Sequence, residues 1–370
     1  MKVLVSVFNN LATDQRVEKV CETLKINGYQ IELIGNDWGG SPKFKRDYPT
    51  KRISLYSRSL KTAYPEFNVK LYKHLMQVAD ENTILLSNDL DTLYPNYLVS
   101  KKLNIPLVFD SHEIFTEMPA IQKRFTQKIW RSIEKKLLPK VRYMMTESES
   151  YSEWFQEKYN IKPIVVRNIP RQIREEIIFP ENEPKIILYQ GVINRSRGLP
   201  QAIDAMNFLD NVIFKIIGDG PKRKEYESMV LDKKLQNKVE FLGQMLPNDM
   251  RKITKTADVG LSLEENGGVS YLYSLPNKVS DYIQAKVPLV MINFPEMMRI
   301  KKEFNIGEVV KDHEPKNIAE KIKTVLENGR SYYKDDLEKA GKKLCWEEEE
   351  LKIIQLFTKV KNENFPAKIS

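Results

Sequence analysis

The sequence has few of the residues that cross-links and metal sites require: two cysteines and three histidines among 370 residues. Cys21 and Cys345 lie far apart in helical patterns, which indicates a reducing compartment and no disulfide. The histidines His74, His112 and His313 are too scattered along the chain to predict a zinc site. We therefore expect neither a metal site nor a disulfide framework.

Long apolar runs are also absent from the sequence. No stretch approaches the roughly 20 apolar residues of a membrane-spanning helix. Met1 leads directly into a strand pattern rather than a signal peptide, so we expect a cytoplasmic protein, free or peripheral at the inner face of the membrane. Hydrophobic residues make up 41% of the chain and charged residues 29%, as in ordinary globular proteins.

The net charge of +9 fits three kinds of partner: nucleic acid, an anionic membrane surface or an anionic substrate. No nucleic-acid-binding motif is present. The aromatic residues do not alternate with basic residues as a base-stacking surface requires. We therefore expect no nucleic acid partner.

The length of 370 residues predicts two domains, because one hydrophobic core rarely serves so long a chain. We predict an N-terminal domain at 1–170, a proline- and charge-rich linker at 171–184, a C-terminal domain at 185–345, and a helical segment at 346–370 that packs back on the N-terminal domain. Strand and helix patterns alternate in both halves. The fold class is therefore α/β, with two doubly wound Rossmann-like domains facing each other across a cleft.

The individual elements follow from hydrophobic periodicity and turn residues. The expected strands are 2–7, 30–34, 83–86, 107–110, 143–146 and 164–166, then 185–189, 212–217, 239–242, 259–263, 288–292 and 308–310. The expected helices are 16–27, 67–80, 94–103 and 149–159, then 200–206, 222–235, 248–257, 277–285, 295–304, 315–327, 331–344 and 346–360.

The stretch 261–293 predicts the main binding site. A buried strand is followed by a loop with Gly267 and Gly268, and then by a helix that opens at Pro276 and carries Lys278 in its first turn. Free backbone N–H groups, a helix dipole and a cation therefore converge at one spot. This combination suits a bound phosphate or diphosphate, so we predict a nucleotide-diphosphate site there.

Several short motifs occur in a characteristic order. They are Thr-Asp-Gln-Arg-Val at 13–17, Phe-Asp-Ser-His-Glu at 109–113, Tyr-Gln-Gly at 189–191, Gly-Asp-Gly-Pro at 218–221, Phe-Leu-Gly at 241–243 and Ser-Leu-Pro-Asn-Lys at 274–278. In this order the chain resembles the retaining glycosyltransferases of the GT-B fold, in the large fourth sequence family of bacterial polysaccharide and glycolipid enzymes. The resemblance covers nearly the whole chain. It implies transfer of a sugar from a nucleotide-diphosphate sugar, with retention and without a metal or cofactor, to a glycan or lipid-linked acceptor in cell-surface polysaccharide synthesis.

The resemblance also assigns catalytic roles. Arg197 and Lys278 stand where the family places its phosphate-binding pair, with Arg195 as a helper. Such charges stabilise the departing diphosphate in the transition state. His112 stands where the family has a histidine near the transferred sugar, and we expect Glu113 to orient it.

The donor side departs from the family pattern at one position. Asp281 falls on the second glutamate of the paired-glutamate motif and is expected to bind the ribose, but Tyr273 replaces the first glutamate. Glu264 or Glu265 is a candidate to reach the sugar in its place. The remaining donor-binding candidates are Gly191, Gly243, Gly268 and Asn277.

The acceptor side is predicted from the first strand end. Asn10 replaces a family glycine in the loop at 9–13, and Asp14 and Arg16 are expected to fix this loop or to contact the acceptor. No pair of carboxylates in the sequence has the pattern expected of a catalytic nucleophile and a general acid. The sequence therefore favours front-face substitution, with double displacement as the alternative.

The stretch 121–142 is a basic amphipathic pattern with apolar residues every fourth position. It predicts either a helix on an anionic membrane surface or a core-facing helix with a solvated basic face. Two alternative functions also remain: a nucleotide-sugar epimerase on the same fold, and a non-catalytic nucleotide-binding module, which Tyr273 motivates. A phosphorylase would need a pyridoxal-bearing lysine context, for which the sequence offers no candidate.

Overall fold

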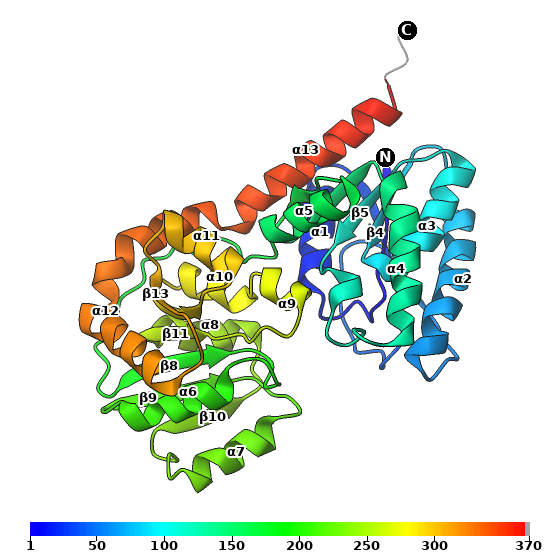
Figure 1. Ribbon diagram of the computed structural model, residues 1–370. Helices are drawn as coiled ribbons and strands as arrows, with labels where there is room; N and C mark the ends of the chain where they lie inside the picture. The colour runs from blue at the N-terminus through cyan, green and yellow to red at the C-terminus, as the bar shows by residue number, and fades with distance from the viewer. Residues whose placement is uncertain (367–370) are drawn as a thin grey trace. The chain divides into compact units, whose positions relative to one another are not determined.

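The computed structural model describes residues 1–366 and divides the chain into two compact units (Figure 1). Unit 1 consists of Met1–Arg167 and the segment Glu349–Ser370, and unit 2 consists of Asn168–Glu348. The last four residues of the predicted segment 346–370 lie outside the described residues.

Unit 1 contains a seven-stranded sheet in the order β3-β2-β1-β4-β5-β6-β7. Its neighbouring strands are all parallel. The strands are β1 (Lys2–Ser6), β2 (Gln30–Asn36), β3 (Thr50–Ile53), β4 (Thr83–Asn88), β5 (Leu107–Ser111), β6 (Tyr143–Thr146) and β7 (Ile164–Val165). The helices are α1 (Gln15–Ile26), α2 (Leu60–Val78), α3 (Leu90–Leu103), α4 (Phe125–Leu137) and α5 (Glu149–Tyr159), with short 3₁₀ turns η1 (Phe115–Glu117) and η2 (Leu138–Lys140).

Unit 2 contains a six-stranded parallel sheet in the order β10-β9-β8-β11-β12-β13. The strands are β8 (Lys185–Gln190), β9 (Val212–Ile217), β10 (Val239–Gly243), β11 (Val259–Ser262), β12 (Leu289–Ile292) and β13 (Gly307–Val310). The helices are α6 (Leu199–Ala205), α7 (Arg223–Asp232), α8 (Pro247–Thr256), α9 (Val269–Tyr273), α10 (Asn277–Gln284), α11 (Pro295–Glu303) and α12 (Pro315–Lys343), with the 3₁₀ turn η3 (Met206–Phe208). Helix α13 (Trp346–Asn364) begins with the last residues of unit 2, and its residues from Glu349 onward belong to unit 1.

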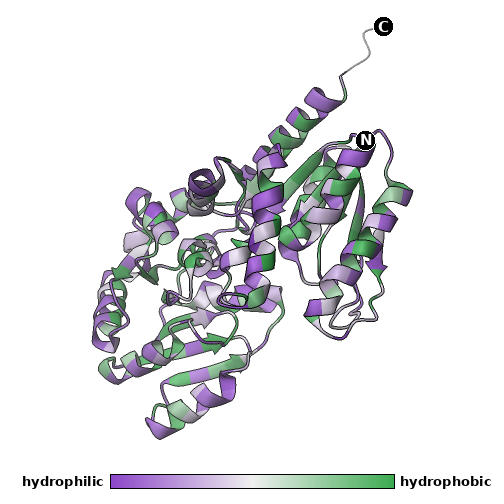
Figure 2. Cartoon of the chain, turned by 45° about the vertical axis from the view of Figure 1, so that its right-hand side comes forward, coloured by the Kyte–Doolittle hydropathy of each residue, from purple (hydrophilic) through white to green (hydrophobic). Residues whose placement is uncertain are grey.

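The central strands are buried on both faces, as parallel sheets covered by helices require. Figure 2 shows this as largely hydrophobic strands and as helices that carry both hydrophobic and hydrophilic colours. The predicted alternation of strands and helices is therefore confirmed in both units. In such sheets, functional residues gather where the strands end at their carboxyl edge.

Several elements differ from the sequence prediction. Helices α2 and α3 begin earlier than expected and continue through Pro65 and Pro95, because buried residues such as Ala63 and Leu93 hold their first turns on the sheet. Strand β3 and helix α9 were not predicted. The break predicted between 327 and 331 is present as Gly329, which interrupts α12 with a φ of 72°.

The segment predicted as a linker, 171–184, belongs to unit 2. Its backbone is held there, because the Ile173 N–H donates to the Gln284 side chain at 3.0 Å and Ile177 is buried. Helix α13 contacts unit 1 through Phe357, which packs edge-on against Tyr29 with ring centroids 5.8 Å apart. Across residues 1–366, no helix combines the length and hydrophobicity needed to span a membrane.

Candidate functional site

The predicted phosphate site of unit 2 lies where β8, β11 and the start of α10 meet. Lys278, in the first turn of α10, extends its chain beside Gly191, which directly follows β8. A Cβ on Gly191 would stand 3.7 Å from Lys278 Cε. No side chain caps the N-terminus of α10, where Pro276 is the N-cap residue. The dipole end of α10 and the Lys278 cation are therefore brought together, as the sequence predicts.

Lys278 is not a free surface cation, because it forms a buried ion pair with Glu264. The Lys278 ammonium donates to Glu264 Oε1 at 2.8 Å, and only 7% and 3% of the two side chains are exposed. The ammonium also lies 4.0 Å from the centre of the Tyr189 ring. Burial alone would raise the pKa of Glu264, but the Lys278 charge and a hydrogen bond from Ser262 outweigh it and lower that pKa.

This ion pair changes the interpretation of Glu264. The sequence offered Glu264 as a substitute contact to the sugar, but its carboxylate is committed to Lys278 and Ser262. Glu265 remains nearer the loop surface, where its N–H donates to the Ser196 carbonyl at 3.1 Å. This bond joins the loop after β11 to the loop after β8.

The loop after β8 carries the two predicted arginines. Arg197 is half-buried, with its guanidinium carbon 5.2 Å from the centre of the Tyr271 ring, whereas Arg195 is exposed. The loop closes at Gly198, whose φ is 68°. A Cβ there would stand 2.1 Å from the Leu263 carbonyl oxygen, so only glycine allows the two loops to approach this closely.

The other donor-side candidates occupy the same edge of the sheet. Asp281 accepts a hydrogen bond from Gln190 Nε2 at 2.9 Å, so its carboxylate is held against the end of β8. Tyr273 is half-buried at the end of α9, and Gly268 is the N-cap residue of that helix. Asn277 is the first residue of α10, and Gly243 ends β10. Their ligand contacts stay predictions.

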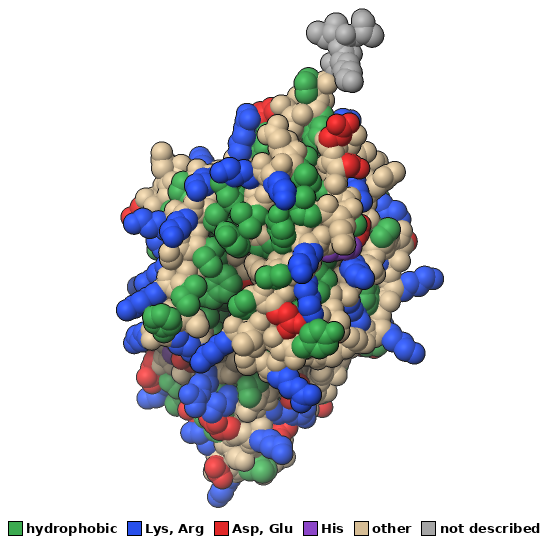
Figure 3. All heavy atoms as spheres, turned by 90° about the vertical axis from the view of Figure 1, so that its right-hand side faces the viewer, with side chains coloured by type: hydrophobic (Ala, Val, Ile, Leu, Met, Phe, Trp, Pro, Cys, Tyr) green, Lys and Arg blue, Asp and Glu red, His purple; other side chains and the backbone are tan. Residues whose placement is uncertain are grey.

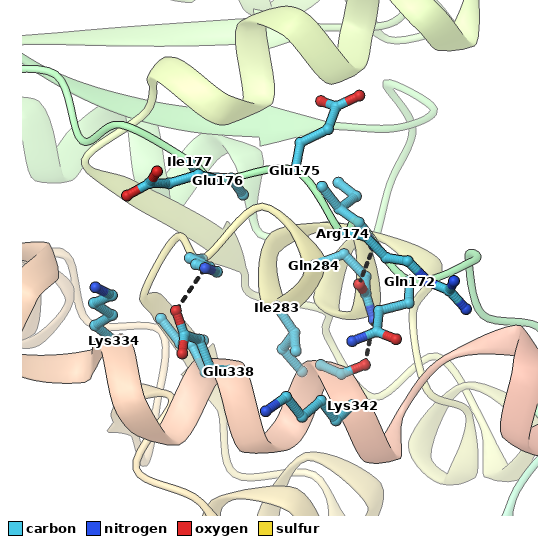
Figure 4. Close-up of a pocket in the computed structure, with 14 residues that line it drawn as sticks. Gln172, Arg174, Glu175, Glu176, Ile177, Ile283, Gln284, Lys334, Glu338 and Lys342 are labelled. Carbon is cyan, nitrogen blue, oxygen red and sulfur yellow. Dashed lines mark hydrogen bonds and ion pairs between the residues drawn. The ribbon is translucent and has the colours of Figure 1, made fainter.

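A cavity of about 430 Å³ lies at the opposite end of α10 (Figure 4). The segment 172–177 forms one wall, and α12 forms another. Its charges are of both signs, and Lys286 is paired with Glu338 at 2.6 Å. Because this cavity adjoins the carboxyl-terminal end of α10, it is separate from the phosphate site predicted at the helix start.

In unit 1, His112 follows β5 and lies in a network at the carboxyl edge of the sheet. Its Nε2 is 3.1 Å from Asn88 Oδ1 and 3.2 Å from Asp110 Oδ2. Because the Asn88 amide donates its own N–H to the Ser6 carbonyl, its oxygen faces the ring and Nε2 must carry a proton. The other ring nitrogen, Nδ1, is 3.5 Å from Asp89 Oδ2.

Asp110 is the centre of this network. Arg16 donates to both of its carboxylate oxygens, at 2.6 and 3.0 Å. Burial would raise the pKa of Asp110, but the charges of Arg16 and His112 lower it to about 2. Burial would lower the pKa of His112, but Asp89 and Asp110 raise it from 6.5 to about 10. His112 is thus a cation at neutral pH.

The sign of this shift has a consequence for stability. The pKa of His112 is higher in the folded protein than its ordinary value of 6.5. The stabilisation of the folded protein by protonated His112 is therefore fully present below about pH 6.5 and is lost as the pH rises through about 10. Because two carboxylates surround the ring, His112 keeps its proton near neutral pH, and its contact with the sugar or the phosphate stays a prediction.

Asp89 has an unusual backbone conformation, with φ 58° and ψ 167°. For a residue other than glycine this region costs about 1–3 kcal/mol. Asp89 is also the N-cap residue of α3, but its side chain makes no cap hydrogen bond. Its Oδ1 instead accepts the backbone N–H of His112 at 2.9 Å. An N-cap contribution of roughly 1 kcal/mol is thus forgone for contact with His112.

The acceptor-side candidates divide into two groups. Asp14 caps α1 by accepting the Val17 N–H at 3.0 Å and also accepts from Asn9, so it fixes the loop as predicted. Asn10 accepts the Ala12 N–H at 3.2 Å within that loop. The side chain of Arg16 turns inward and is only 3% exposed, so it is not placed to contact an acceptor, and its role in fixing the loop stays a prediction.

The sequence left four residues of these networks unassigned: Asn88, Asp89, Asp110 and Glu147. Asn88 ends a fully buried six-residue strand and Asp89 directly follows it, which is a signal that could have identified them. Glu147 follows β6, and burial raises its pKa to about 7 against the charges of Arg16 and His112. Glu113 is half-buried beside His112, and its orienting role stays a prediction.

Two protein-family models match the chain. Residues 171–344 match the model described as glycosyl transferases group 1. Residues 14–176 match the model described as glycosyltransferase family 4. No curated protein sequence matches the chain. Each sheet-bearing half therefore carries a glycosyltransferase match of its own.

Solved structures match over nearly the full length. Sucrose-phosphate synthase from Thermosynechococcus elongatus is 15% identical, with a TM-score of 0.79 over 98% of this chain and 100% of that one. A glycosyltransferase from Rickettsia africae is 15% identical, with a TM-score of 0.73 over 97% and 98%. Anabaena HepE in complex with UDP-glucose is 14% identical, with a TM-score of 0.75 over 97% and 100%. At these identities the likeness shows the fold, which is GT-B.

The fold and the two family matches together define the class of protein. The chain is a glycosyltransferase of the GT-B fold, with one parallel-sheet unit for each matched half.

Proposed function

We infer that the protein is a retaining glycosyltransferase that moves a sugar from a nucleotide-diphosphate sugar to a glycan or lipid-linked acceptor in cell-surface polysaccharide synthesis. The observation that carries this proposal is the convergence of Lys278, Gly191 and the uncapped start of α10 at one edge of the unit 2 sheet. The UDP-glucose complex of the structurally similar HepE supports a nucleotide-sugar as the donor.

In the proposed reaction, unit 2 binds the diphosphate. Lys278, Arg197 and the α10 N–H groups take up the negative charge that develops as the bond between the sugar and the phosphate breaks. The acceptor oxygen bonds to the same face of the sugar, and its proton passes to the departing phosphate oxygen. In this scheme no protein carboxylate acts as nucleophile, and no metal ion is needed because side chains and backbone neutralise the diphosphate.

A panel of UDP-, GDP- and ADP-sugars tests the proposal. We expect one donor class to release nucleoside diphosphate in the presence of a glycan or lipid-linked acceptor. Proton NMR of the product should show the donor's anomeric configuration retained. Interconversion of the sugar while it stays attached to the nucleotide would instead indicate an epimerase. Tight nucleotide binding without turnover of any donor would indicate a binding module.

We also propose that α4 rests on an anionic membrane surface, which would bring the enzyme to a lipid-linked acceptor. Two polar residues of this helix, Gln127 and Glu134, are buried together with Leu137, and Glu134 accepts hydrogen bonds from Thr116 and Tyr159. The apolar Phe125 and Ile129 face outward, with 75% and 47% exposure. A helix whose apolar residues all face the core would bury these two.

The surroundings of these residues suit an anionic bilayer. The side of unit 1 that carries α2 and α3 shows hydrophobic side chains with lysines and arginines at their margins (Figure 3). The exposed basic residues of the α4 region are Lys123, Arg124, Lys128, Arg131, Lys135, Lys136 and Lys140. Each basic residue near an anionic surface contributes about 1 kcal/mol of attraction.

Replacing Phe125 and Ile129 together by serine should weaken binding to vesicles with anionic lipid by about tenfold or more, since each buried apolar side chain contributes roughly 1.5–3 kcal/mol. Vesicle co-sedimentation measures this. The matched control is Leu231→Ser with Leu246→Ser, two exposed apolar residues of unit 2, which should bind as the unchanged protein does. Equal binding to neutral vesicles, or no effect of the α4 changes, would contradict the proposal.

A further inference from the structure

The contacts of Asp89 are unusual for its position. An aspartate before a helix ordinarily accepts hydrogen bonds from the first turn of that helix. Asp89 instead directs its carboxylate to His112, whose backbone N–H and ring Nδ1 lie 2.9 and 3.5 Å from its two oxygens. Its backbone adopts a left-handed conformation to do so. Helix capping does not account for this arrangement, but the orientation of His112 does.

We propose that Asp89 is a positioning residue that keeps the His112 ring fixed and doubly protonated, with an Nδ1–H that a substrate oxygen can share. The ring is held from both sides. Nε2–H is engaged by Asn88 and Asp110, at 3.1 and 3.2 Å. The Nδ1 contact of 3.5 Å to Asp89 is longer than an ordinary hydrogen bond, so this N–H is weakly engaged and can be shared with a ligand oxygen while the ring stays in place.

The charges around the ring explain why it stays protonated. The groups that face it come from every neighbouring element: Asp14 and Arg16 at α1, Asp89 and Asp91 at the start of α3, Asp110 on β5 and Glu147 after β6. Arg16 already balances Asp110 through two hydrogen bonds. Asp89 therefore supplies the counter-charge for the imidazolium, and without it the ring would face Arg16 with less compensation.

A fixed cation narrows the role expected of His112. It would donate a hydrogen bond to the transferred sugar or the departing phosphate, and it would not act as a titrating acid or base. This role rests on the proposed function, but the state of the ring does not. The two can therefore be tested separately.

Ring NMR tests the state of His112 directly. The chain has only three histidines, so His74→Gln and His313→Gln variants assign the third ring. We expect Asp89→Asn to lower the ring pKa of His112 by roughly 1–3 units, the usual effect of removing one adjacent opposite charge. The unchanged protein should titrate near its pKa of about 10.

Asp91→Asn is the matched control. Asp91 lies two residues away on α3, and burial raises its pKa well above the ordinary value, which favours its uncharged form. Its replacement should leave the ring pKa unmoved. Asp89→Gly is the second variant, because glycine tolerates the backbone conformation. We expect it to lower the ring pKa as Asp89→Asn does while unfolding at the same or a higher denaturant concentration.

A ring pKa that moves by less than half a unit in Asp89→Asn and Asp89→Gly would overturn the proposal. A shift of the same size in Asp91→Asn would also overturn it, because the effect would then not belong to Asp89. With an active donor in hand, Asp89→Asn should add an alkaline decline to the pH profile of kcat, which the Asp91→Asn profile should lack. If no donor is turned over, the proposed function fails, and the NMR result still decides the role of Asp89.

Discussion

Replacing Lys278 by alanine is expected to cause the largest loss of function in the molecule, for two reasons that must be separated. The first is loss of the cation beside Gly191 and the start of α10. A charge-assisted contact to phosphate contributes about 1.5–3 kcal/mol, which corresponds to a 10- to 150-fold weaker affinity for nucleoside diphosphate. The second is structural, because Glu264 would remain buried without its partner.

The structural effect is large enough to hide the functional one. Removing one partner of a buried ion pair costs about 3–5 kcal/mol of stability. The informative variant is therefore Lys278→Met combined with Glu264→Gln, which removes both charges and keeps the volumes similar. We expect it to recover most of the stability lost in Lys278→Ala, as measured by chemical denaturation. Its affinity for nucleoside diphosphate should stay at the low level of the single variant.

Calorimetry with two ligands completes this test. The double variant should bind the nucleoside as the unchanged protein does and the nucleoside diphosphate more weakly. Equal losses for both ligands would contradict the phosphate assignment. The matched control is Lys286→Ala, which breaks a more exposed lysine–glutamate pair at the other end of α10. This control should change stability by less than about 1 kcal/mol and leave both affinities unchanged.

The Lys278–Glu264 pair also illustrates what sequence reasoning could and could not predict. Hydrophobic alternation and turn residues located the strands and the helix start, so Lys278 was correctly expected in the first turn of α10. The partner of Lys278 lies 14 positions away across a loop, and no local pattern gives that pairing. A buried ion pair is a tertiary contact, and its sequence signature is only two charged residues near a strand end.

Unit 1 shows the same division between local and tertiary information. His112 was expected at a strand end because a buried run precedes it. The bond from Arg16 to Asp110 spans 94 positions, so the inward turn of Arg16 was not foreseeable. The left-handed backbone of Asp89 was also hidden, because the sequence suggests such conformations mainly through glycine.

The amphipathic stretch at 121–142 is a different case, because the sequence left two orientations open. Its period of four residues was read correctly as a helix, but periodicity does not say which face is turned inward. The deciding information is the buried hydrogen bonding of Glu134 and Gln127, which depends on Thr116 and Tyr159. Buried polar partners therefore help to decide which residues of a helix are turned inward, and hydrophobicity alone does not reveal them.

The second large effect is expected at Arg330, which lies on α12 immediately after Gly329. Its guanidinium is buried and donates to four backbone carbonyls. The acceptors are Lys255 and Ala257 at the end of α8, at 2.7 and 3.0 Å, and Ala285 and Lys286 at the end of α10, at 2.8 and 3.2 Å. One face of the group stacks on Phe179 at 4.4 Å.

The Arg330 guanidinium therefore donates hydrogen bonds to the backbone carbonyls at the ends of two helices, α8 and α10. Helix carbonyl ends lack intrahelical partners and carry partial negative charge, which a buried cation stabilises. Burial lowers the pKa of Arg330 to about 10, so the group stays charged at neutral pH. Arg330→Met would leave four carbonyls unsatisfied, each at a cost of about 1–3 kcal/mol. We expect a loss of at least about 4 kcal/mol, with Arg330→Lys intermediate because an ammonium cannot reach both helix ends.

Amide hydrogen exchange identifies the helices that lose stability in Arg330→Met. In Arg330→Met the protection of α8 and α10 should drop while the helices of unit 1 keep theirs, since opening is confined to the elements that Arg330 joins. Nucleotide affinity should also fall, although Arg330 lies at the end of α10 opposite Lys278, because the whole helix then opens more often. The matched control is Arg251→Ala on α8, whose exposed side chain donates to Asn248. If α10 kept full protection in Arg330→Met, the four carbonyl bonds would not be what anchors the helix that carries Lys278.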